Sequence, residues 1–251
     1  MTISYSQRFQ QPEAVAAYET REYGAESYST RIWQLQRPWV EKILADFKIR
    51  HRNALRLLDF ACGTGRVLAC VEAFADEADG VDISEAMVSV ARTRCRRARL
   101  RVGDVLADPG LLEKKYDVIT CFRLLLNLEP ALRGRILGQL RQALSGPEGL
   151  LLVNIHGNSH SLRHPAVRWR RWRERSAPSG VMLNEMSPVE TEKLLQENGF
   201  RVLRKAGFGI LPPGLYKTPL RGAAFAMDRL AAGEGAWSRW SVDVLFVCAP
   251  A

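Results

Sequence analysis

Short apolar runs alternate along this chain with stretches whose apolar residues recur at helical spacing. Five of the runs are bordered by turn residues and predict buried strands, at 55–61, 78–83, 99–103, 116–122 and 150–155. Helices are predicted between them, including one that begins after Ser84 and one that Pro130 opens. Strands that alternate with helices in this way form parallel sheets, so the pattern predicts an α/β protein.

The two ends of the chain depart from this rhythm. Residues 1–36 are polar and aromatic, and we expect them to form a helical lid segment ahead of a domain at 37–251. A regular helix is predicted from Pro38 onwards. The stretches 156–186 and 211–240 lack the alternation, so we interpret them as insertions that cap the sheet. The second insertion is predicted to be a loop with one helix.

The strand pattern returns after the first insertion. Ser187 and Pro188 open a predicted helix, and the runs at 200–208 and 241–248 have the alternating or continuous apolar character of a terminal pair of strands. Together with the five earlier runs, this pair predicts a mostly parallel sheet of seven strands.

The composition is that of a globular protein whose positive charge is unevenly spread. Apolar residues make up 47% and charged residues 25%, which excludes a disordered, collagenous or disulfide-scaffold protein. The net charge of +9 comes from two stretches, 92–101 and 163–175, each with six arginines. We expect the first to lie on the solvated face of a helix. The second interleaves arginines with Trp169 and Trp172. It is either a contact for an acidic substrate, a membrane surface or RNA, or a helix with its tryptophans packed inward.

The cysteine spacing and the hydropathy of the sequence indicate the cellular environment of the protein. The five cysteines are widely spaced, with no CxxC pair and no clustering with histidine, so no metal site is predicted. The N-terminal residues 1–11 are polar, unlike a signal peptide, and the longest apolar runs are too short to cross a bilayer. These features predict a cytoplasmic protein without a transmembrane segment.

A glycine-rich turn follows the first predicted strand. Residues 59–65 read Asp-Phe-Ala-Cys-Gly-Thr-Gly. Glycine lets the backbone approach a ligand closely, and the helix that follows offers free N–H groups. Asp82 ends the second strand, and Gly103-Asp104-Val105 ends the third. Because the carboxyl ends of parallel strands meet at one edge of a sheet, these motifs predict a ligand crevice there.

With these motifs in this order, the sequence resembles the class I S-adenosylmethionine-dependent methyltransferases. Residues 59–65 are similar to the family's first motif, although Ala61 stands where glycine is commoner, an exchange that costs little if its φ is negative. The resemblance covers residues 38–155 well and 187–250 loosely. It implies a Rossmann-like, seven-stranded, mostly parallel sheet with helices on both faces, an N-terminal lid and cap insertions.

The resemblance also implies S-adenosylmethionine as the cofactor. Asp82 is implied to bind the ribose hydroxyls, Ile83 and Met87 the faces of the adenine, and Asp104 with the N–H of Val105 the adenine edge. Further implied contacts lie in the glycine-rich turn, at the end of the fourth strand and in the lid: Asp59, Ala61, Cys62, Gly63, Gly65, Phe122, Tyr28 and Arg31. In the lid, Arg31 is expected to pair with the methionine carboxylate.

Two side chains are candidates for the catalytic step. His156 follows the fifth predicted strand and is a candidate general base, or else a histidine bonded to its own loop. Asn127 follows the fourth strand and either orients a substrate hydroxyl or belongs to the start of the helix at Pro130. His160 and His164 lie in the first insertion, where the sequence leaves surface and substrate contact equally open.

The sequence therefore predicts a methyltransferase that acts on an oxygen or nitrogen of a small molecule. A dehydrogenase is disfavoured because Leu68 occupies the place of the third glycine in that fingerprint. An RNA or other nucleic-acid methyltransferase is the first alternative, disfavoured because Arg123-Leu124-Leu125-Leu126 replaces an Asn-Pro-Pro-Tyr-like motif. A non-catalytic, cofactor-binding regulatory protein is the second. A homodimer is left open.

Overall fold

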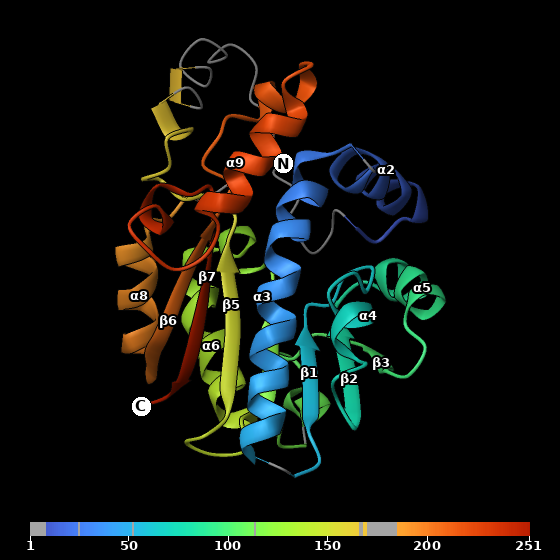
Figure 1. Cartoon of the computed structure of the whole chain (residues 1–251). Coiled ribbons are helices and arrows are strands. Elements are labelled where there is room, and N and C mark those ends of the chain that lie inside the picture. The colour runs from blue at the N-terminus through green and yellow to red at the C-terminus, as the bar shows by residue number, and fades with distance from the viewer. Residues whose placement is uncertain (1–8, 25, 52, 113, 166–167, 170–184) are drawn as a thin grey trace.

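The computed structural model describes residues 9–24, 26–51, 53–112, 114–165, 168–169 and 185–251. Its centre is a seven-stranded sheet in the order β3-β2-β1-β4-β5-β7-β6 (Figure 1). The strands are β1 (Arg56–Phe60), β2 (Glu77–Asp82), β3 (Arg99–Val102), β4 (Val118–Cys121), β5 (Leu150–Ile155), β6 (Phe200–Phe208) and β7 (Asp243–Pro250). Strands β1 to β5 pair in parallel, and β7 pairs antiparallel with both β5 and β6. The predicted Rossmann-like α/β sheet is confirmed.

Helices cover both faces of this sheet (Figure 1). The α-helices are α2 (Pro12–Tyr23), α3 (Tyr28–His51), α4 (Leu68–Val71), α5 (Glu85–Arg94), α6 (Pro130–Ala143), α8 (Pro188–Glu197) and α9 (Arg221–Ala231). Short 3₁₀ turns are η1 (Pro109–Leu112), η2 (Leu125–Asn127), η3 (Pro213–Lys217) and η4 (Ser238–Trp240). Helices α3 and α4 pack on the face that carries Leu57 and Leu152, and α6 and α8 on the face that carries Leu58 and Leu151.

Helices α5 and α8 each begin directly after a serine whose side chain caps the helix. The hydroxyl of Ser84 accepts a hydrogen bond from the N–H of Met87 and begins α5. Ser187 and Glu190 bond reciprocally at the start of α8, with Pro188 in its first turn. Both helices begin where the sequence predicted them.

Helix α3 begins earlier than predicted, at Tyr28, and runs through Pro38. The buried side chains Ile32 and Leu35 before the proline continue on the same face as Val40 and Ile43 after it. A proline inside a helix removes a backbone hydrogen bond, and here the buried apolar face holds the helix together across it. Among the described residues of the predicted lid segment, α2 is therefore the helix that stands apart from α3, and the boundary at residue 36 stays a prediction.

The two predicted insertions differ in how much of them the structure describes. Residues 211–240 hold η3, α9 and η4, which agrees with a loop and one α-helix. In the first insertion, residues 166–167 and 170–184 lie outside the described residues, and with them most of the predicted arginine–tryptophan segment. No helix in the described ranges has the length and apolar character needed to cross a membrane.

Candidate active site

A cavity of about 720 Å³ lies at the carboxyl ends of the central strands. It is lined by thirteen of the fifteen residues that the sequence predicted for the site: Tyr28, Asp59, Ala61, Cys62, Gly63, Asp82, Ile83, Met87, Asp104, Val105, Phe122, Asn127 and His156. Gly65 and Arg31 do not line it. The sheet edge thus brings the motifs together as the sequence predicted.

The glycine-rich turn is held against Asp82. Its carboxylate accepts hydrogen bonds from the N–H of Gly63 at 2.8 Å and from the N–H of Ser84 at 2.9 Å. Gly63 has a φ of 53°, and a Cβ there would meet open space, so the cavity reaches the bare backbone at this point. Gly65 lies behind the turn instead, where a Cβ would approach the Cβ of Ala91 to 3.0 Å.

Ala61 has a positive φ of 56°, so the condition under which alanine costs little at this position is not met. The left-handed region costs a residue with a Cβ about 1–2 kcal/mol relative to the right-handed one. Ala61 thus adopts the conformation for which glycine is better suited.

Asp59 is buried at the base of the turn. Its Oδ1 accepts a hydrogen bond from the hydroxyl of Thr120 at 2.6 Å, whereas Oδ2 has no partner of hydrogen-bond geometry among the described residues. Burial raises the pKa of this carboxyl to about 7, only partly offset by hydrogen bonds from Thr120 and from the backbone of Leu68. A buried carboxylate oxygen left free in a cavity wall suits a cationic ligand group, such as the ammonium of an amino acid.

The adenine end of the predicted site is open and partly apolar. The side chain of Ile83 is 40% exposed at the cavity wall, beside the buried Met87. Asp104 accepts a hydrogen bond from the N–H of Leu106 through Oδ1 at 2.9 Å. An apolar surface bordered by a carboxylate suits a flat ring with an exocyclic amino group. Together with the free oxygen of Asp59 and the open space at Gly63, these residues fit S-adenosylmethionine.

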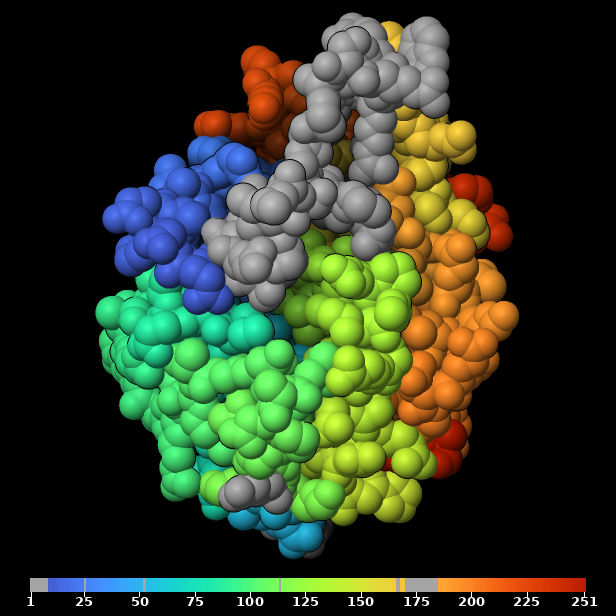
Figure 2. Space-filling view, turned by 180° about the vertical axis from the view of Figure 1, so that it is seen from behind, coloured from blue at the N-terminus to red at the C-terminus, as the bar shows by residue number. Residues whose placement is uncertain are grey.

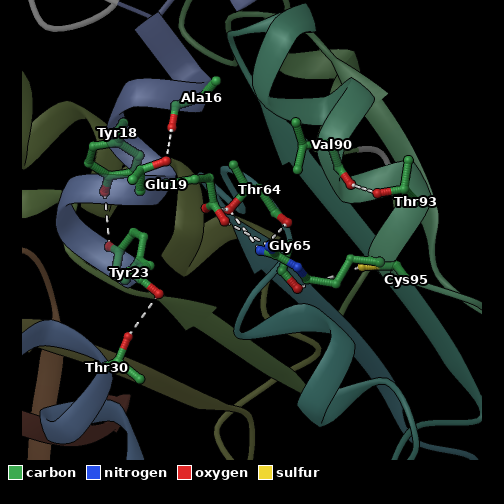
Figure 3. A network of polar contacts seen from close by, with 12 residues as sticks. Ala16, Tyr18, Glu19, Tyr23, Thr30, Thr64, Gly65, Val90, Thr93 and Cys95 are labelled. Carbon is green, nitrogen blue, oxygen red and sulfur yellow. Dashed lines mark hydrogen bonds and ion pairs between the residues drawn. The ribbon is translucent and has the colours of Figure 1, made fainter. Parts of the chain in front are cut away.

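Helix α2 covers the glycine-rich turn and is latched to it (Figure 3). Glu19 accepts a hydrogen bond from the hydroxyl of Thr64 and pairs with Arg94 of α5 at 2.8 Å. Arg94 also donates to the carbonyl of Thr64 at 2.9 Å. Figure 2 shows the α2 segment, in blue, seated directly on the green part of the chain that includes α5. Helix α2, which belongs to the segment predicted to be a lid, is therefore tied to the glycine-rich turn.

The arginines of residues 92–101 were expected to lie on a solvated helix face. The structure differs, because two of them are half-buried. Arg92, Arg96, Arg97 and Arg99 are exposed, but Arg94 is half-buried in the α2 contact. Arg101 is also half-buried, and it pairs with Asp79 at 2.9 Å and donates to the hydroxyl of Tyr116. Helical periodicity alone could not show that another helix packs onto this face.

Arg31 lies away from the cavity, contrary to its predicted role. It pairs with Glu26, and its guanidinium lies 5.5 Å from the ring of Tyr216. Cations that do line the cavity near the lid include Arg21, Arg66 and Arg123. The guanidinium carbons of Arg66 and Arg123 lie 3.4 and 5.5 Å from the centroid of the Tyr23 ring.

A buried polar network forms the other end of the cavity. Asn154 of β5 accepts a hydrogen bond from the N–H of Arg123 at 2.6 Å and donates to Asp243 of β7 at 2.8 Å. Gln36 of α3 donates to the same carboxylate at 2.7 Å. Burial raises the pKa of Asp243 to about 7, and the hydrogen bonds from Asn154 and Gln36 counteract this only in part. Polar residues within the apolar strands β5 and β7 were the signal that sequence reasoning missed.

The predicted catalytic side chains lie at this end. Burial and the charge of Arg123 hold the pKa of His156 well below its usual range, so the imidazole is neutral at pH 7. Its Nδ1 is without a hydrogen-bond partner in the described ranges. The amide of Asn127 donates to the carbonyl of Arg123 at 2.5 Å, which fixes the turn after β4. His164 also lines the cavity, with its Nδ1 3.3 Å from Glu185.

Comparisons with known proteins agree with this geometry. A methyltransferase-domain family model matches residues 32–205. A demethylmenaquinone methyltransferase of Leptospira interrogans is 26% identical over 143 residues, covering 54% of this chain and 55% of the relative. A ubiquinone biosynthesis O-methyltransferase of Pelagibacter ubique is 32% identical over 85 residues, covering 32% and 35%. The chain spans about half the length of the first of these relatives, and about a third of the second.

Solved structures share the fold. The magnesium protoporphyrin IX methyltransferase of Synechocystis with bound S-adenosylhomocysteine has a TM-score of 0.57 at 17% identity, covering 89% of this chain and 87% of its own. A protein of Pyrococcus horikoshii reaches 0.60 at 17% identity, covering 95% and 99%. Because the family model spans well over half of the sequence and the sheet has the matching strand order, the chain belongs to the class I S-adenosylmethionine-dependent methyltransferases.

Proposed function

We propose that this chain transfers a methyl group from S-adenosylmethionine to an oxygen or nitrogen atom of a small-molecule acceptor. The observation that carries the proposal is the cavity of about 720 Å³, which joins the acidic residues at the carboxyl ends of β1, β2 and β3 to the polar network at β4, β5 and β7. A cavity of this size suits a cofactor and a small acceptor together. The names of the relatives, which refer to quinones and a porphyrin, support an acceptor of this class.

The cofactor contacts are proposed position by position. The free Oδ2 of Asp59 binds the ammonium of the methionine moiety, Asp82 accepts from the ribose hydroxyls, and Asp104 accepts from the adenine amino group. The remaining contacts are apolar or made by the backbone, from Ala61, Cys62, Gly63, Ile83, Met87, Val105, Phe122 and Tyr28. Gly65 acts indirectly, because it lets α5 pack close behind the turn.

The cofactor supplies an electrophilic methyl carbon on a positively charged sulfur. The protein's part is to orient the acceptor and to exclude water. Helix α2 closes the cavity through the latch at Glu19, and Asn127 fixes the turn at Arg123. Neutral His156 can accept a hydrogen bond from an acceptor hydroxyl at Nδ1, although its lowered pKa makes it a weak base. Its role as general base stays a prediction.

The charge distribution supports a small molecule over RNA. Arg94 and Arg101, from the stretch that first suggested nucleic acid, form ion pairs within the chain with Glu19 and Asp79. An arginine engaged in this way contributes less to a phosphate-binding surface than a free one.

A panel of acceptors tests the proposed function. The protein is incubated with S-adenosylmethionine that carries a labelled methyl group and with phenols, hydroquinones, carboxylic acids, amines or bulk tRNA. We expect label transfer to at least one small-molecule class and none to tRNA. Labelled tRNA would favour a nucleic-acid methyltransferase. Cofactor binding without transfer to any of the acceptors would favour a regulatory protein.

The cysteines support a further proposal, a reducing cytoplasmic location. All five are free thiols, and burial raises the pKa of Cys62, Cys121 and Cys248 well above the usual range. Thiols of this kind are inert and need no disulfide partner.

We expect the rate of cofactor release to depend on the contacts of Glu19 with Thr64 and Arg94, which form the lid latch. Arg94→Gln removes the ion pair with Glu19, which is about a quarter to a third exposed and therefore contributes about 0.5–1 kcal/mol. We expect S-adenosylhomocysteine to dissociate roughly two- to fivefold faster, measured by stopped-flow fluorescence. Arg92→Gln is the matched control, because Arg92 lies on the same helix and pairs with Glu85 instead. Equal rates in the two variants would contradict the role of the latch.

A further inference from the structure

Helix α9 turns several large apolar side chains away from the protein. Leu230 is 87% exposed and Met227 55%, and Leu220 at the start of the helix is 63% exposed. At 100° per residue these three positions and Ala223 fall on one side of the helix. Figure 2 shows the α9 segment, in orange-red, projecting from the molecule. Large apolar side chains on one exposed face are typical of an interaction surface.

The side of α9 that faces the protein carries the partly buried Phe225, the buried Ala224 and one buried polar residue. Asp228 is fully buried there and accepts hydrogen bonds from the N–H groups of Ile210 at 2.8 Å and Leu211 at 3.1 Å, and from the hydroxyl of Tyr216. Ala224 is the other buried residue of the helix. An amphipathic helix normally buries its apolar face. Here an aspartate fixes the orientation of the helix, and this orientation presents leucine and methionine to the outside.

Exposed basic side chains lie on the same segment, at other positions around the helix and in the turn before it. Lys217, Arg221 and Arg229 are exposed, and Arg221 has only a long ion pair, 3.6 Å from Glu26. In the part of the chain that the structure describes, Lys217 and Arg229 have no ion pair. The segment that ends at Trp169 stands at the same end of the molecule (Figure 1), and Trp169 is 58% exposed beside Arg168. Apolar and aromatic side chains bordered by cations are complementary to an anionic lipid surface.

The α9 surface is connected to the cavity. Tyr216, which bonds to Asp228, packs edge-on against Tyr28 with ring centroids 5.6 Å apart, and Tyr28 lines the cavity. The hydroxyl of Tyr28 donates to the carbonyl of Leu211, whose N–H donates to Asp228. Figure 1 places α9 beyond the carboxyl end of β5, on the side of the sheet where the cavity lies.

We propose that α9 docks this protein onto a bilayer that contains anionic lipid. Leu220, Met227 and Leu230 enter the boundary between headgroups and acyl chains, while Lys217, Arg221 and Arg229 contact the headgroup phosphates. A second copy of the chain fits this surface less well, because a two-fold contact would bring two patches of the same positive charge together. As a consequence that rests on the proposed function, the docked cavity receives an apolar acceptor from the membrane.

Vesicle co-sedimentation with the full chain tests the proposal. The probes are vesicles of phosphatidylcholine alone and of phosphatidylcholine mixed with phosphatidylglycerol. We expect binding to the mixed vesicles that weakens as salt is raised. The double variant Met227→Ser, Leu230→Ser is expected to bind at least tenfold more weakly, and Lys217→Gln with Arg229→Gln to lose most of the salt dependence. Ile49→Ser is the matched control, because Ile49 is 73% exposed at the far end of α3.

Two further measurements distinguish membrane docking from a loss of the fold and from a contact with a second copy of the chain. Each variant should bind S-adenosylhomocysteine as the unmodified protein does, which shows that the fold and the cofactor site are intact and keeps this test independent of the proposed function. Vesicle binding that is absent, or equally strong in the double serine variant, would overturn the proposal. A dimer that the double serine variant dissociates, seen by sedimentation velocity without vesicle binding, would assign the surface to a second copy instead.

Discussion

Asp82→Ala is expected to weaken the binding of S-adenosylhomocysteine by about 100-fold or more. The carboxylate holds the N–H groups of Gly63 and Ser84 and, as proposed, accepts from the ribose hydroxyls. A hydrogen bond to a charged group is worth roughly 1.5–3 kcal/mol, and each 1.4 kcal/mol changes a dissociation constant about tenfold. The variant loses the ribose contacts and also releases the glycine-rich turn from its bound shape. Isothermal titration calorimetry measures the loss directly.

Two variants calibrate this result. Asp82→Asn keeps one oxygen for a backbone N–H but places a donor where the second acceptor was, so we expect a loss smaller than in Asp82→Ala. Asp108→Ala removes an exposed aspartate that also bonds a backbone N–H, from Gly110, outside the cavity lining, and its affinity should be unchanged. An affinity in Asp82→Ala equal to that of Asp108→Ala would contradict the assignment of the cofactor site.

The sheet and the cofactor end of the cavity could be predicted because their signals are local. A compact apolar run makes a buried strand wherever it occurs, and the residue that follows it necessarily lies at the sheet edge. Asp59 and Asp82 lie in the last residues of β1 and β2, Asp104 follows the end of β3, and all three line the same cavity. Their convergence needs only the parallel pairing of β1, β2 and β3, which the alternation of strands and helices already indicates.

The polar network at the other end of the cavity could not be predicted in the same way, because its contacts join distant segments. Gln36, Asn154 and Asp243 meet through hydrogen bonds across α3, β5 and β7. Each of these residues alone is only a polar residue beside apolar ones. Their pairing depends on the antiparallel register of β5 with β7, in which Asn154 lies opposite Leu245. No local sequence pattern fixes that register.

Arg31 and Ala61 show two other limits. Arg31 was expected to cover the cavity because it lies among the aromatic residues of the lid segment, but α3 extends back to Tyr28 and carries Arg31 to the side that faces Tyr216. The helix ahead of Pro38, nearly three turns long, sets the direction of this side chain. At Ala61 the residue type favours negative φ, and the tight turn between β1 and Gly63 imposes the opposite. Tertiary geometry outweighs a local preference of about 1 kcal/mol.

The pKa of Asp59 makes cofactor binding and stability depend on pH in opposite directions. In the folded chain this pKa is about 7, above the ordinary value of 3.8, because the carboxyl is buried. Its contribution to stability is therefore fully present below pH 3.8 and is lost as the pH rises through about 7. An ammonium that binds at Oδ2 favours the ionised form. Affinity for S-adenosylhomocysteine should then fall as the pH drops below about 7, by up to tenfold per pH unit.

Asp59→Asn separates these two effects in a side chain of nearly the same shape. The amide oxygen still accepts from Thr120, so the fold is retained, and the variant should melt at a higher temperature than the unmodified protein at pH 8 because no buried charge forms. Its affinity for S-adenosylhomocysteine should be lower at pH 8 and nearly independent of pH between 6 and 8. Asp243→Asn is the control, since the pKa of Asp243 is also about 7 but its carboxylate bonds to Asn154 and Gln36. If the pH dependence of binding vanished in Asp243→Asn and persisted in Asp59→Asn, the ammonium site would have to lie at the other end of the cavity.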